Sequence, residues 1–305
     1  MEEVLISVLI RAHDRREFLV GAVKSALNQT LDRKFYEVIV VKNWRDDEVD
    51  NFLEKNNVIN LFKEDIAGQL ILEGAKASSG NVLSFLDDDD RFLENKLEAV
   101  YNNFKKRRKL TYYHNGYSAV DDSGKPVSFL HNTIDFGMSN ISIIKKALRT
   151  DMLARISFFQ DPIVFSMALD YGEKIVDDKT KLTEYLVHQS ASNFLGINFA
   201  EYKERSYASY KKYLDNANMA VSLLKRRRAK NYMKAIIGDL KMGRFQFNPE
   251  IKPDHVLNFI TCRHIPRKRR WIQFKSYMAL KLFPDKFRPI ILKKREEQFK
   301  AGKEN

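Results

Sequence analysis

A strand-like apolar segment runs directly into four carboxylates at Asn81-Val82-Leu83-Ser84-Phe85-Leu86-Asp87-Asp88-Asp89-Asp90. Four adjacent like charges repel one another, so such a cluster at a strand end is typical of a site that holds something positive. Hard divalent cations such as magnesium and manganese prefer oxygen ligands and often share their site with a substrate phosphate. A solvated acidic turn is the alternative interpretation. The strand and helix pattern around the segment favours a metal and phosphate site.

Length and composition indicate a globular protein. The chain of 305 residues is long enough for one large domain or two modest ones, and 44% apolar with 30% charged residues is ordinary for a soluble protein. The single cysteine, Cys262, excludes an internal disulfide and a cysteine metal cluster, which favours a reducing compartment. The N-terminal residues do not match a secretory signal, and no apolar run approaches the ~20 residues of a membrane span. We therefore expect a cytoplasmic protein.

The positive charge is concentrated in the last third of the chain. The net charge is +13, but residues 201–305 contain 27 Lys and Arg against 10 Asp and Glu, or +17. The other 200 residues contain 26 basic and 30 acidic side chains, or −4. Two regions with different roles follow from this asymmetry: a front part that carries out chemistry and a tail that contacts an anionic partner.

Strands and helices alternate along the front part. Apolar runs predict strands at 4–10, 36–41, 58–62 and 81–86, and helical spacing predicts helices at 17–27, from Asp46, at 68–77 and at 93–105. Asp14 is the expected N-cap of the first helix. Units of this length predict an α/β fold with a mostly parallel sheet and right-handed crossovers.

Ligands of such sheets bind beyond the carboxyl ends of the strands. Polar residues follow three predicted strands at 11–14, 42–45 and 87–90, so we expect these three clusters on one edge. The first turn contains no glycine, which excludes the dinucleotide-binding fingerprint, and no P-loop motif is present. The pattern indicates a protein that binds a nucleotide diphosphate through a metal.

The chain resembles the family 2 glycosyltransferases, which have the GT-A fold. The matching segments, in order, are Ile6-Ser7-Val8-Leu9-Ile10, Asp14-Arg15-Arg16-Glu17-Phe18-Leu19, Ala26-Leu27-Asn28-Gln29-Thr30, Glu37-Val38-Ile39-Val40-Val41, Ser79-Gly80-Asn81-Val82, and Phe85-Leu86-Asp87-Asp88-Asp89-Asp90 with Asn95-Lys96-Leu97. The resemblance covers roughly residues 4–195. It implies a GT-A catalytic domain at 1–195 and a basic helical region at 196–305.

The resemblance also implies roles for the aspartates. Asp89 would be the metal ligand, and Asp87 and Asp88 would contact the ribose or complete the metal shell. A cation there would stabilise the charge that develops on the leaving diphosphate. Asp90 is either part of this site or the cap of the following helix. His188 lies in a segment that resembles the end of the catalytic domain, where it would approach the metal or the diphosphate, with a structural role as the alternative.

Two turns differ from the family pattern. After the second strand, Lys42-Asn43-Trp44-Arg45 replaces the usual acidic motif. Asn43 has a donor and an acceptor with which to read a base edge, and Trp44 would stack on a base or anchor the loop. After the first strand, Arg11 and His13 would contact the phosphate and the base, unless Arg11 pairs with nearby carboxylates.

An inverting glycosyltransferase needs a general base to deprotonate the acceptor hydroxyl. Asp161 is our candidate because it follows two phenylalanines and precedes a helical run, and apolar neighbours raise the pKa of a carboxyl. The alternative is that Asp161 caps this helix, since Pro162 is typical of a first helical turn. Asp151 and Asp170 are weaker candidates.

The tail from about residue 199 is predicted to be helical, with basic runs at 225–228 and 267–270. In the last amphipathic segment Trp271, Phe274, Met278 and Leu282 share one face, which suits an anionic membrane surface. Packing alone and nucleic-acid binding are the alternatives.

Together these patterns predict an inverting glycosyltransferase that depends on manganese or magnesium. It would move a sugar from a nucleotide-diphospho-sugar donor to a hydroxyl acceptor on a glycan, a lipid-linked sugar or a protein. We expect it in the cytoplasm, with peripheral contact to the cytoplasmic face of the membrane. The alternatives are a binding or scaffold protein on a degenerate GT-A fold and a nucleic-acid-binding protein that uses the basic tail.

Overall fold

A computed structural model describes residues 4–13, 16–121, 123–127, 137–157, 160–172, 174–187, 198–243 and 250–301. The chain divides into two compact units, Met1–His188 and Gln189–Asn305. The predicted domain boundary, between residues 195 and 196, lies in the stretch 188–197, outside the described residues.

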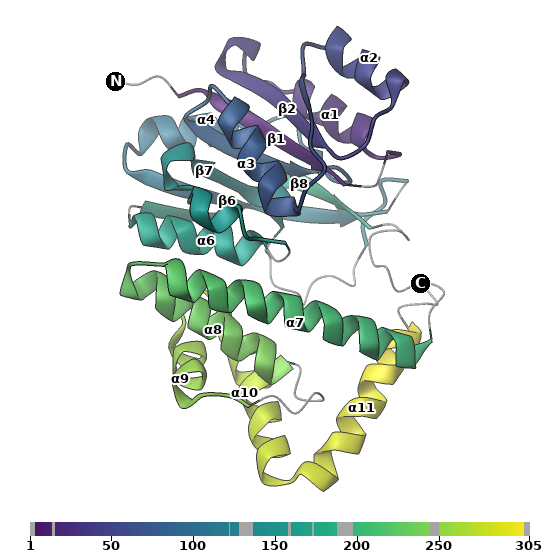
Figure 1. Ribbon diagram of the computed structural model, residues 1–305, viewed down its shortest axis with the longest axis vertical. Coiled ribbons are helices and arrows are strands. Elements are labelled where there is room, and N and C mark those ends of the chain that lie inside the picture. The colour runs from purple at the N-terminus through teal and green to yellow at the C-terminus, as the bar shows by residue number, and fades with distance from the viewer. Residues whose placement is uncertain are drawn as a thin grey trace. The chain divides into compact units, whose positions relative to one another are not determined.

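The first unit is built on an eight-stranded sheet (Figure 1). Its strands are β1 (Ile6–Ala12), β2 (Tyr36–Lys42), β3 (Ile59–Phe62), β4 (Val82–Asp87), β5 (Arg91–Phe92), β6 (Leu110–Val120), β7 (Ile141–Ile144) and β8 (Lys174–Leu186), in the order β3-β2-β1-β4-β7-β6-β8-β5. The pairs β3–β2, β2–β1, β1–β4 and β6–β8 are parallel, whereas β4–β7, β7–β6 and β8–β5 are antiparallel. The predicted α/β fold with a mostly parallel sheet is confirmed.

The helices of the first unit cover both faces of this sheet. They are α1 (Leu19–Leu27), α2 (Asp47–Lys55), α3 (Ala67–Ala77), α4 (Lys96–Lys106), α5 (Thr150–Leu153) and α6 (Gln160–Tyr171), with short 3-10 turns η1 (Arg33–Phe35), η3 (Met138–Asn140) and η4 (Lys145–Ala147). Asp46 caps α2 by accepting the N–H groups of Glu48 and Val49. Asp14 lies outside the described residues, and α1 follows Phe18, whose side chain makes no capping hydrogen bond.

The alternation of side chains along the strands explains the two covered faces. Ile6, Val8 and Ile10 of β1 point to one face and form a core with apolar residues of α1, α2 and α4. Ile39 and Val41 of β2 point to the other face and pack on Leu70 of α3. A central parallel strand buried on both faces is therefore mostly apolar, as β1 is from Ile6 to Ile10 apart from the buried Ser7.

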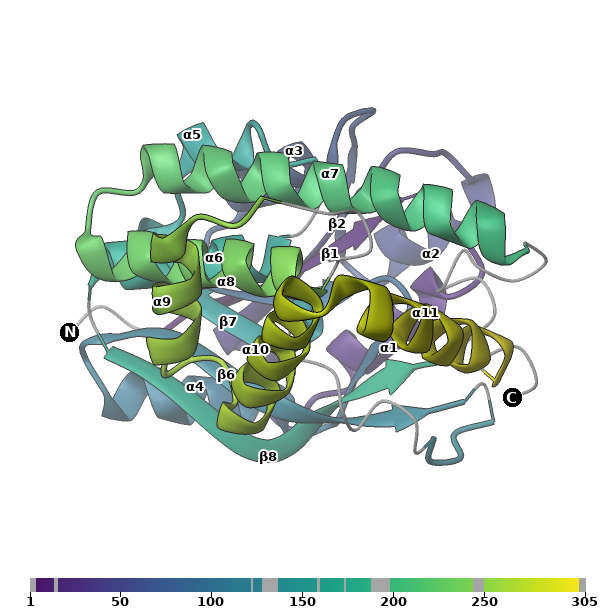
Figure 2. The same ribbon diagram turned by 90° about the horizontal axis from the view of Figure 1, so that it is seen from below.

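Two long strands, β6 and β8, follow α4 in the chain. The apolar and aromatic runs 110–113 and 117–120 suggest two separate strands, but they form one strand, β6, whose pairing with β8 shifts register around Gly116. A side chain at Gly116 would place its Cβ 2.7 Å from the carbonyl oxygen of Lys179. The long curved strand β8, visible beside β6 in Figure 2, was missed because its sequence is mostly polar and half its residues face solvent.

The second unit is helical, as predicted. It contains α7 (Phe199–Leu223), α8 (Arg227–Gly243), α9 (Pro253–Thr261), α10 (Arg267–Leu282) and α11 (Pro284–Ala301). Part of its basic sequence stabilises the unit itself, since Arg269 makes a bidentate pair with the buried Asp239, with Nη2 to Oδ2 at 2.7 Å. Within the described part of the chain, no helix has both the length and the apolar character needed to cross a membrane.

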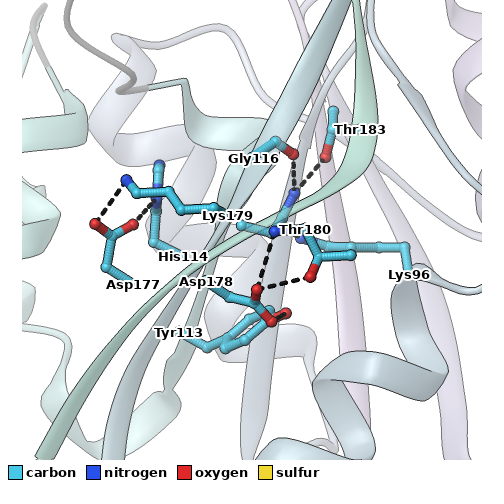
Figure 3. A network of polar contacts seen from close by, with 10 residues as sticks. Lys96, Tyr113, His114, Gly116, Asp177, Asp178, Lys179, Thr180 and Thr183 are labelled. Carbon is cyan, nitrogen blue, oxygen red and sulfur yellow. Dashed lines mark hydrogen bonds and ion pairs between the residues drawn. The ribbon is translucent and has the colours of Figure 1, made fainter.

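A buried lysine begins α4. The Lys96 side chain has no solvent exposure, donates to the Asn115 side-chain oxygen, and lies over the Phe92 ring with Nζ 5.2 Å from its centroid. Asn115 in turn donates to Thr183 Oγ1 at 3.1 Å (Figure 3, in which Lys96 and Thr183 are labelled). Burial lowers the pKa of Lys96 from 10.5 to about 7, because an ammonium ion is poorly solvated there.

The lowered pKa of Lys96 predicts a pH-dependent stability. Between pH ~7 and ~10 the unfolded chain binds a proton that the folded chain does not, so the free energy of unfolding should rise with pH. The drop in pKa from 10.5 to about 7 corresponds to roughly 5 kcal/mol. The substitution Lys96→Met should remove this rise, which denaturant unfolding across that pH range would measure.

The control is Lys106→Met, at the exposed far end of the same helix, which should keep the wild-type pH profile. If the free energy of unfolding changed with pH in the same way for wild type and for Lys96→Met, the pKa of Lys96 would not be lowered.

Candidate active site

The carboxyl ends of β1, β2 and β4 meet at one edge of the sheet. In the strand register Arg11 is opposite Asp87, and Ala12 is opposite Lys42. The three polar clusters that follow these strands therefore lie on one edge, as the sequence predicted. This edge is the site to examine for chemistry.

An ion pair between neighbouring strands is at the centre of this edge. Arg11 Nη2 lies 2.7 Å from Asp87 Oδ1, and both side chains are about three-quarters buried. Burial by itself lowers the pKa of Arg11, but the charge and hydrogen bond of Asp87, together with the charges of Asp161 and Asp88, outweigh burial and raise the pKa above its usual value. One guanidinium is thus close to three carboxylates, so the site is net negative without a further cation.

Asp161 belongs to this cluster although it is distant in sequence. It occupies the first turn of α6 and is half-buried. Burial, and then the charge of Asp87, raises the pKa of Asp161 to about 7, while Arg11 lowers it in part. A carboxyl with a pKa near neutrality is suited to accept a proton from a substrate. The two weaker candidates, Asp151 and Asp170, both pair with Arg149, at 2.6 and 3.0 Å.

The turn that carries the aspartates is held by Ser139 of η3. Ser139 Oγ accepts the Asp87 N–H at 2.9 Å and donates to Asp90 Oδ2 at 2.5 Å. Asp90 also accepts the Leu186 N–H at 3.2 Å, and its side chain is buried. Burial and the charges of Asp87 and Asp89 raise the pKa of Asp90 well above its usual value. Asp90 therefore fixes the turn, and the predicted alternative that it caps the next helix is wrong.

The oxygen ligands at this turn fit a hard cation in part. Asp89 is half-exposed beside the half-buried Asp87. Among the described residues no group of three or more His, Cys, Asp and Glu side chains is arranged to hold a metal ion. His188, the third predicted ligand, lies outside them. A cation that takes one or two carboxylates and completes its shell with substrate phosphate is compatible with this arrangement.

The residues after β1 and β2 have different surroundings. His13 is exposed and Asn43 is half-buried, each beyond the end of its strand. Trp44 is 8% exposed and belongs to the core, so of its two predicted roles the structure supports the anchor. Lys42 stabilises the loop that follows β2. Its Nζ lies 2.6 Å from Asp50 Oδ1 and donates to the Trp44 carbonyl oxygen at 2.9 Å. These two contacts explain why β2 ends in a buried lysine.

Tyr185 is a neighbour of the site that the sequence did not identify. Burial, together with the charges of Asp90, Asp89 and Asp87, raises the pKa of Tyr185 to about 12. Its ring contacts Tyr117 edge to face, with centroids 6.1 Å apart. The two rings lie next to each other because β6 and β8 pair here, which could not be predicted while β8 was missed.

Sequence comparison finds relatives of this chain among glycosyltransferases. An uncharacterized glycosyltransferase of Rickettsia bellii is 28% identical over 159 residues, which are 50% of this chain and 22% of the relative. The chain spans between 22% and 39% of the lengths of three such Rickettsia relatives. TarP of Staphylococcus aureus, a poly(ribitol-phosphate) beta-N-acetylglucosaminyltransferase, is 26% identical over 247 residues, which are 68% of this chain and 75% of TarP.

Solved structures share the fold. The crystal structure of residues 1–349 of S. aureus TarS in complex with UDP-GlcNAc superposes with a TM-score of 0.57 at 12% identity, over 91% of each chain. At this identity the similarity concerns the fold alone, and it agrees with the GT-A architecture. The family model described as glycosyl transferase family 2 matches residues 7–160, from the second residue of β1 to the start of α6. This match covers half of the chain and includes the Arg11–Asp87 edge, so the protein belongs to glycosyl transferase family 2.

Proposed function

We propose that this protein is a metal-dependent, inverting glycosyltransferase that moves a sugar from a nucleotide-diphospho-sugar to a hydroxyl acceptor. The observation that carries the proposal is Asp161. Its carboxyl has a pKa of about 7 and is electrostatically coupled to the Arg11–Asp87 pair at the sheet edge. A proton acceptor and a charged pair at the carboxyl ends of parallel strands are what a single displacement at a sugar carbon needs.

In the proposed reaction Asp161 is the general base. The acceptor oxygen forms a bond to the anomeric carbon, and the bond from that carbon to the diphosphate oxygen breaks. The hydroxyl proton passes to the Asp161 carboxylate, and the bonding electrons leave with the nucleoside diphosphate. Because this is one displacement, the configuration at the anomeric carbon inverts.

The negative charge that develops on the diphosphate needs a positive partner. Asp87 and Asp89 would hold a magnesium or manganese ion, which supplies this charge when bound, and His188 is the third proposed ligand. Arg11 orients Asp87 through their 2.7 Å contact and adds a fixed positive charge. Asp87 and Asp89 fit the cation because their ligand atoms are oxygens and neither side chain is fully buried.

The nucleotide would lie along the ends of β1 and β2. We assign His13 and Asn43 to the base and Asp88 with Asp87 to the ribose. Arg11 takes the alternative role stated above, since it pairs with Asp87, and would act on the phosphates through its charge. The core position of Trp44 supports the assignment of Asn43, because it fixes the loop from which the Asn43 amide extends.

The names of relatives suggest the substrates. TarP transfers N-acetylglucosamine to poly(ribitol-phosphate), a polymer of polyol units joined by phosphodiesters, and TarS has been crystallised with UDP-GlcNAc. We propose UDP-GlcNAc as the first donor to test and a hydroxyl of a phosphate-bearing polymer as the acceptor class.

The basic second unit supports contact with an anionic membrane. The predicted apolar face of α10 has four residues. Trp271 is 48% exposed and Leu282 is 61% exposed, while Phe274 and Met278 are half-buried. Phe283 continues the exposed surface. Within the basic run 267–270, Arg269 and Arg270 are engaged in the unit's own contacts, since Arg269 pairs with Asp239 and Arg270 donates to the Ile265 carbonyl. Arg267, Lys268, Lys275 and Lys281 would contact the headgroups.

The variant Asp161→Asn tests the catalytic assignment. Asparagine keeps the shape but cannot accept the proton, so transfer should fall by roughly two to four orders of magnitude with donor affinity unchanged. Wild-type kcat/KM should rise with pH up to about 7, the pKa of the free Asp161 carboxyl, and then level off. Steady-state transfer assays and donor titrations measure both quantities.

The matched control is Asp151→Asn, which removes a carboxylate paired with Arg149 and should leave transfer near the wild-type rate. If wild type and Asp161→Asn transferred the sugar at equal rates, Asp161 would not be the general base and would serve only at the start of α6.

Co-sedimentation with vesicles tests the membrane assignment. The double variant Trp271→Ser/Leu282→Ser should bind phosphatidylglycerol vesicles more weakly than wild type, since it removes exposed apolar area at roughly 25 cal/mol per Å². Binding should also weaken with salt, because exposed charges are screened within ~10 Å. Leu257→Ser, at an equally exposed leucine of α9, is the control. Indifference of the wild type to vesicle charge would refute membrane contact.

A further inference from the structure

The first unit has a concave site at the edge of the sheet opposite the Arg11–Asp87 pair. A cleft of about 940 Å³ is lined by the start of β4 at Val82, the start of β6 at Leu110 and the end of β7 at Ile144. Because β1 and β4 are parallel, the Arg11–Asp87 pair lies at the other ends of these strands. The six residues of β4 separate the two edges by roughly 20 Å.

The cleft is strongly basic. Its lining contains six cationic side chains, which are Lys105, Arg107, Arg108, Lys109, Lys145 and Lys146. Among the described residues that line it, none is Asp or Glu. One or two cations would suffice to complement the negative C-terminal end of α4, whereas the cleft has six.

Neutral groups hold several of these cations in place. Lys145 donates to the Ser78 carbonyl at 2.6 Å, Arg107 donates to the Asn103 side-chain oxygen, and Lys105 Nζ lies 5.1 Å from the centroid of the Tyr101 ring. Such contacts position a positive charge without neutralising it. Lys105, Arg107 and Lys145 are therefore preorganised to meet an anion.

One carboxylate, that of Asp178, interacts electrostatically with Arg107 of the cleft. Asp178 also accepts the Tyr113 hydroxyl at 2.9 Å and the Thr180 N–H and hydroxyl at 2.9 and 2.7 Å, as Figure 3 shows. Asp178 is therefore shared among several partners and offsets only part of the Arg107 charge.

We propose that this basic cleft binds the phosphodiesters of a polymeric acceptor at a distance from the reacting sugar unit. This inference rests on the proposed function, because it supposes that the acceptor is a phosphate-bearing polymer. A monomeric acceptor is too short to occupy the Asp161 edge and the cleft together, whereas a polymer of repeated phosphates reaches both. The aromatic rings of Tyr101 and Tyr171 in the lining suit the carbon chain of a polyol between phosphates.

The test compares two triple variants of the full chain with equal loss of charge. Lys105→Gln/Arg108→Gln/Lys109→Gln removes three charges from the cleft, and Lys24→Gln/Lys55→Gln/Lys106→Gln removes three exposed charges of the same unit outside it. Binding of fluorescent poly(ribitol phosphate) is measured over a range of salt concentrations. The cleft variant should bind roughly tenfold more weakly than wild type. The slope of log Kd against log salt should fall by about two, as for three contacts on a flexible polyanion.

The control variant should bind the polymer as wild type does. Binding of both variants to phosphatidylglycerol vesicles is measured as well. The proposal would be overturned if both variants lost polymer binding equally, if the cleft variant lost none, or if the cleft variant lost only vesicle binding. If the triple cleft variant does not fold, the three single variants carry the same comparison. Transfer from UDP-GlcNAc to a monomeric ribitol acceptor by the wild type separately tests the proposed function, so a failure of one claim is distinguishable from a failure of the other.

Discussion

The contact between Arg11 and Asp87 depends on two parallel strands whose register is fixed by their buried neighbours. β1 and β4 pair from Ile6 and Val82 onward, so the sixth residue of each strand comes to the same edge with its side chain free to meet the other. A shift of one residue in either strand would turn that strand's side chains to the opposite face, so Arg11 and Asp87 would no longer point to the same side of the sheet. The apolar alternation of the strands thus determines where the charges meet, and Asp161 joins them from the start of α6.

The aspartate turn is held by residues from distant parts of the chain. Ser139 contacts both Asp87 and Asp90, Thr183 donates to the Ser139 carbonyl at 3.1 Å, and Asn115 donates to Thr183. The series ends at the buried Lys96 amine. Each member except Asp87 is buried, so rupture of a hydrogen bond among the buried members would leave an unsatisfied polar group, which is more costly than the bond is worth. This arrangement explains how four adjacent carboxylates keep one geometry.

The sequence predicted the sheet edge well and the supports of the site poorly. Strand ends follow from apolar runs, so the positions of Arg11 and Asp87 could be inferred, and Asp161 was found from its aromatic and proline neighbours. The supporting roles of Ser139, Thr183 and Tyr185 could not be inferred. Thr183 and Tyr185 belong to β8, whose charged residues obscure its strand pattern, and Ser139 meets Asp87 and Asp90 only after folding. Trp44 had two possible roles that only the packing around it distinguishes. The basic cleft combines residues of α4, β6 and η4 that are adjacent only after folding.

The central claim is that the Arg11–Asp87 edge holds the diphosphate of a nucleotide-sugar through a cation. The most direct measurement is anomalous difference density in crystals of the protein soaked with UDP and manganese. The account predicts one manganese peak within roughly 2.0–2.6 Å of an Asp89 or Asp87 oxygen, as for hard cations on carboxylates, with the UDP phosphates beside it. A manganese peak away from both aspartates, or UDP bound elsewhere on the chain, would contradict it.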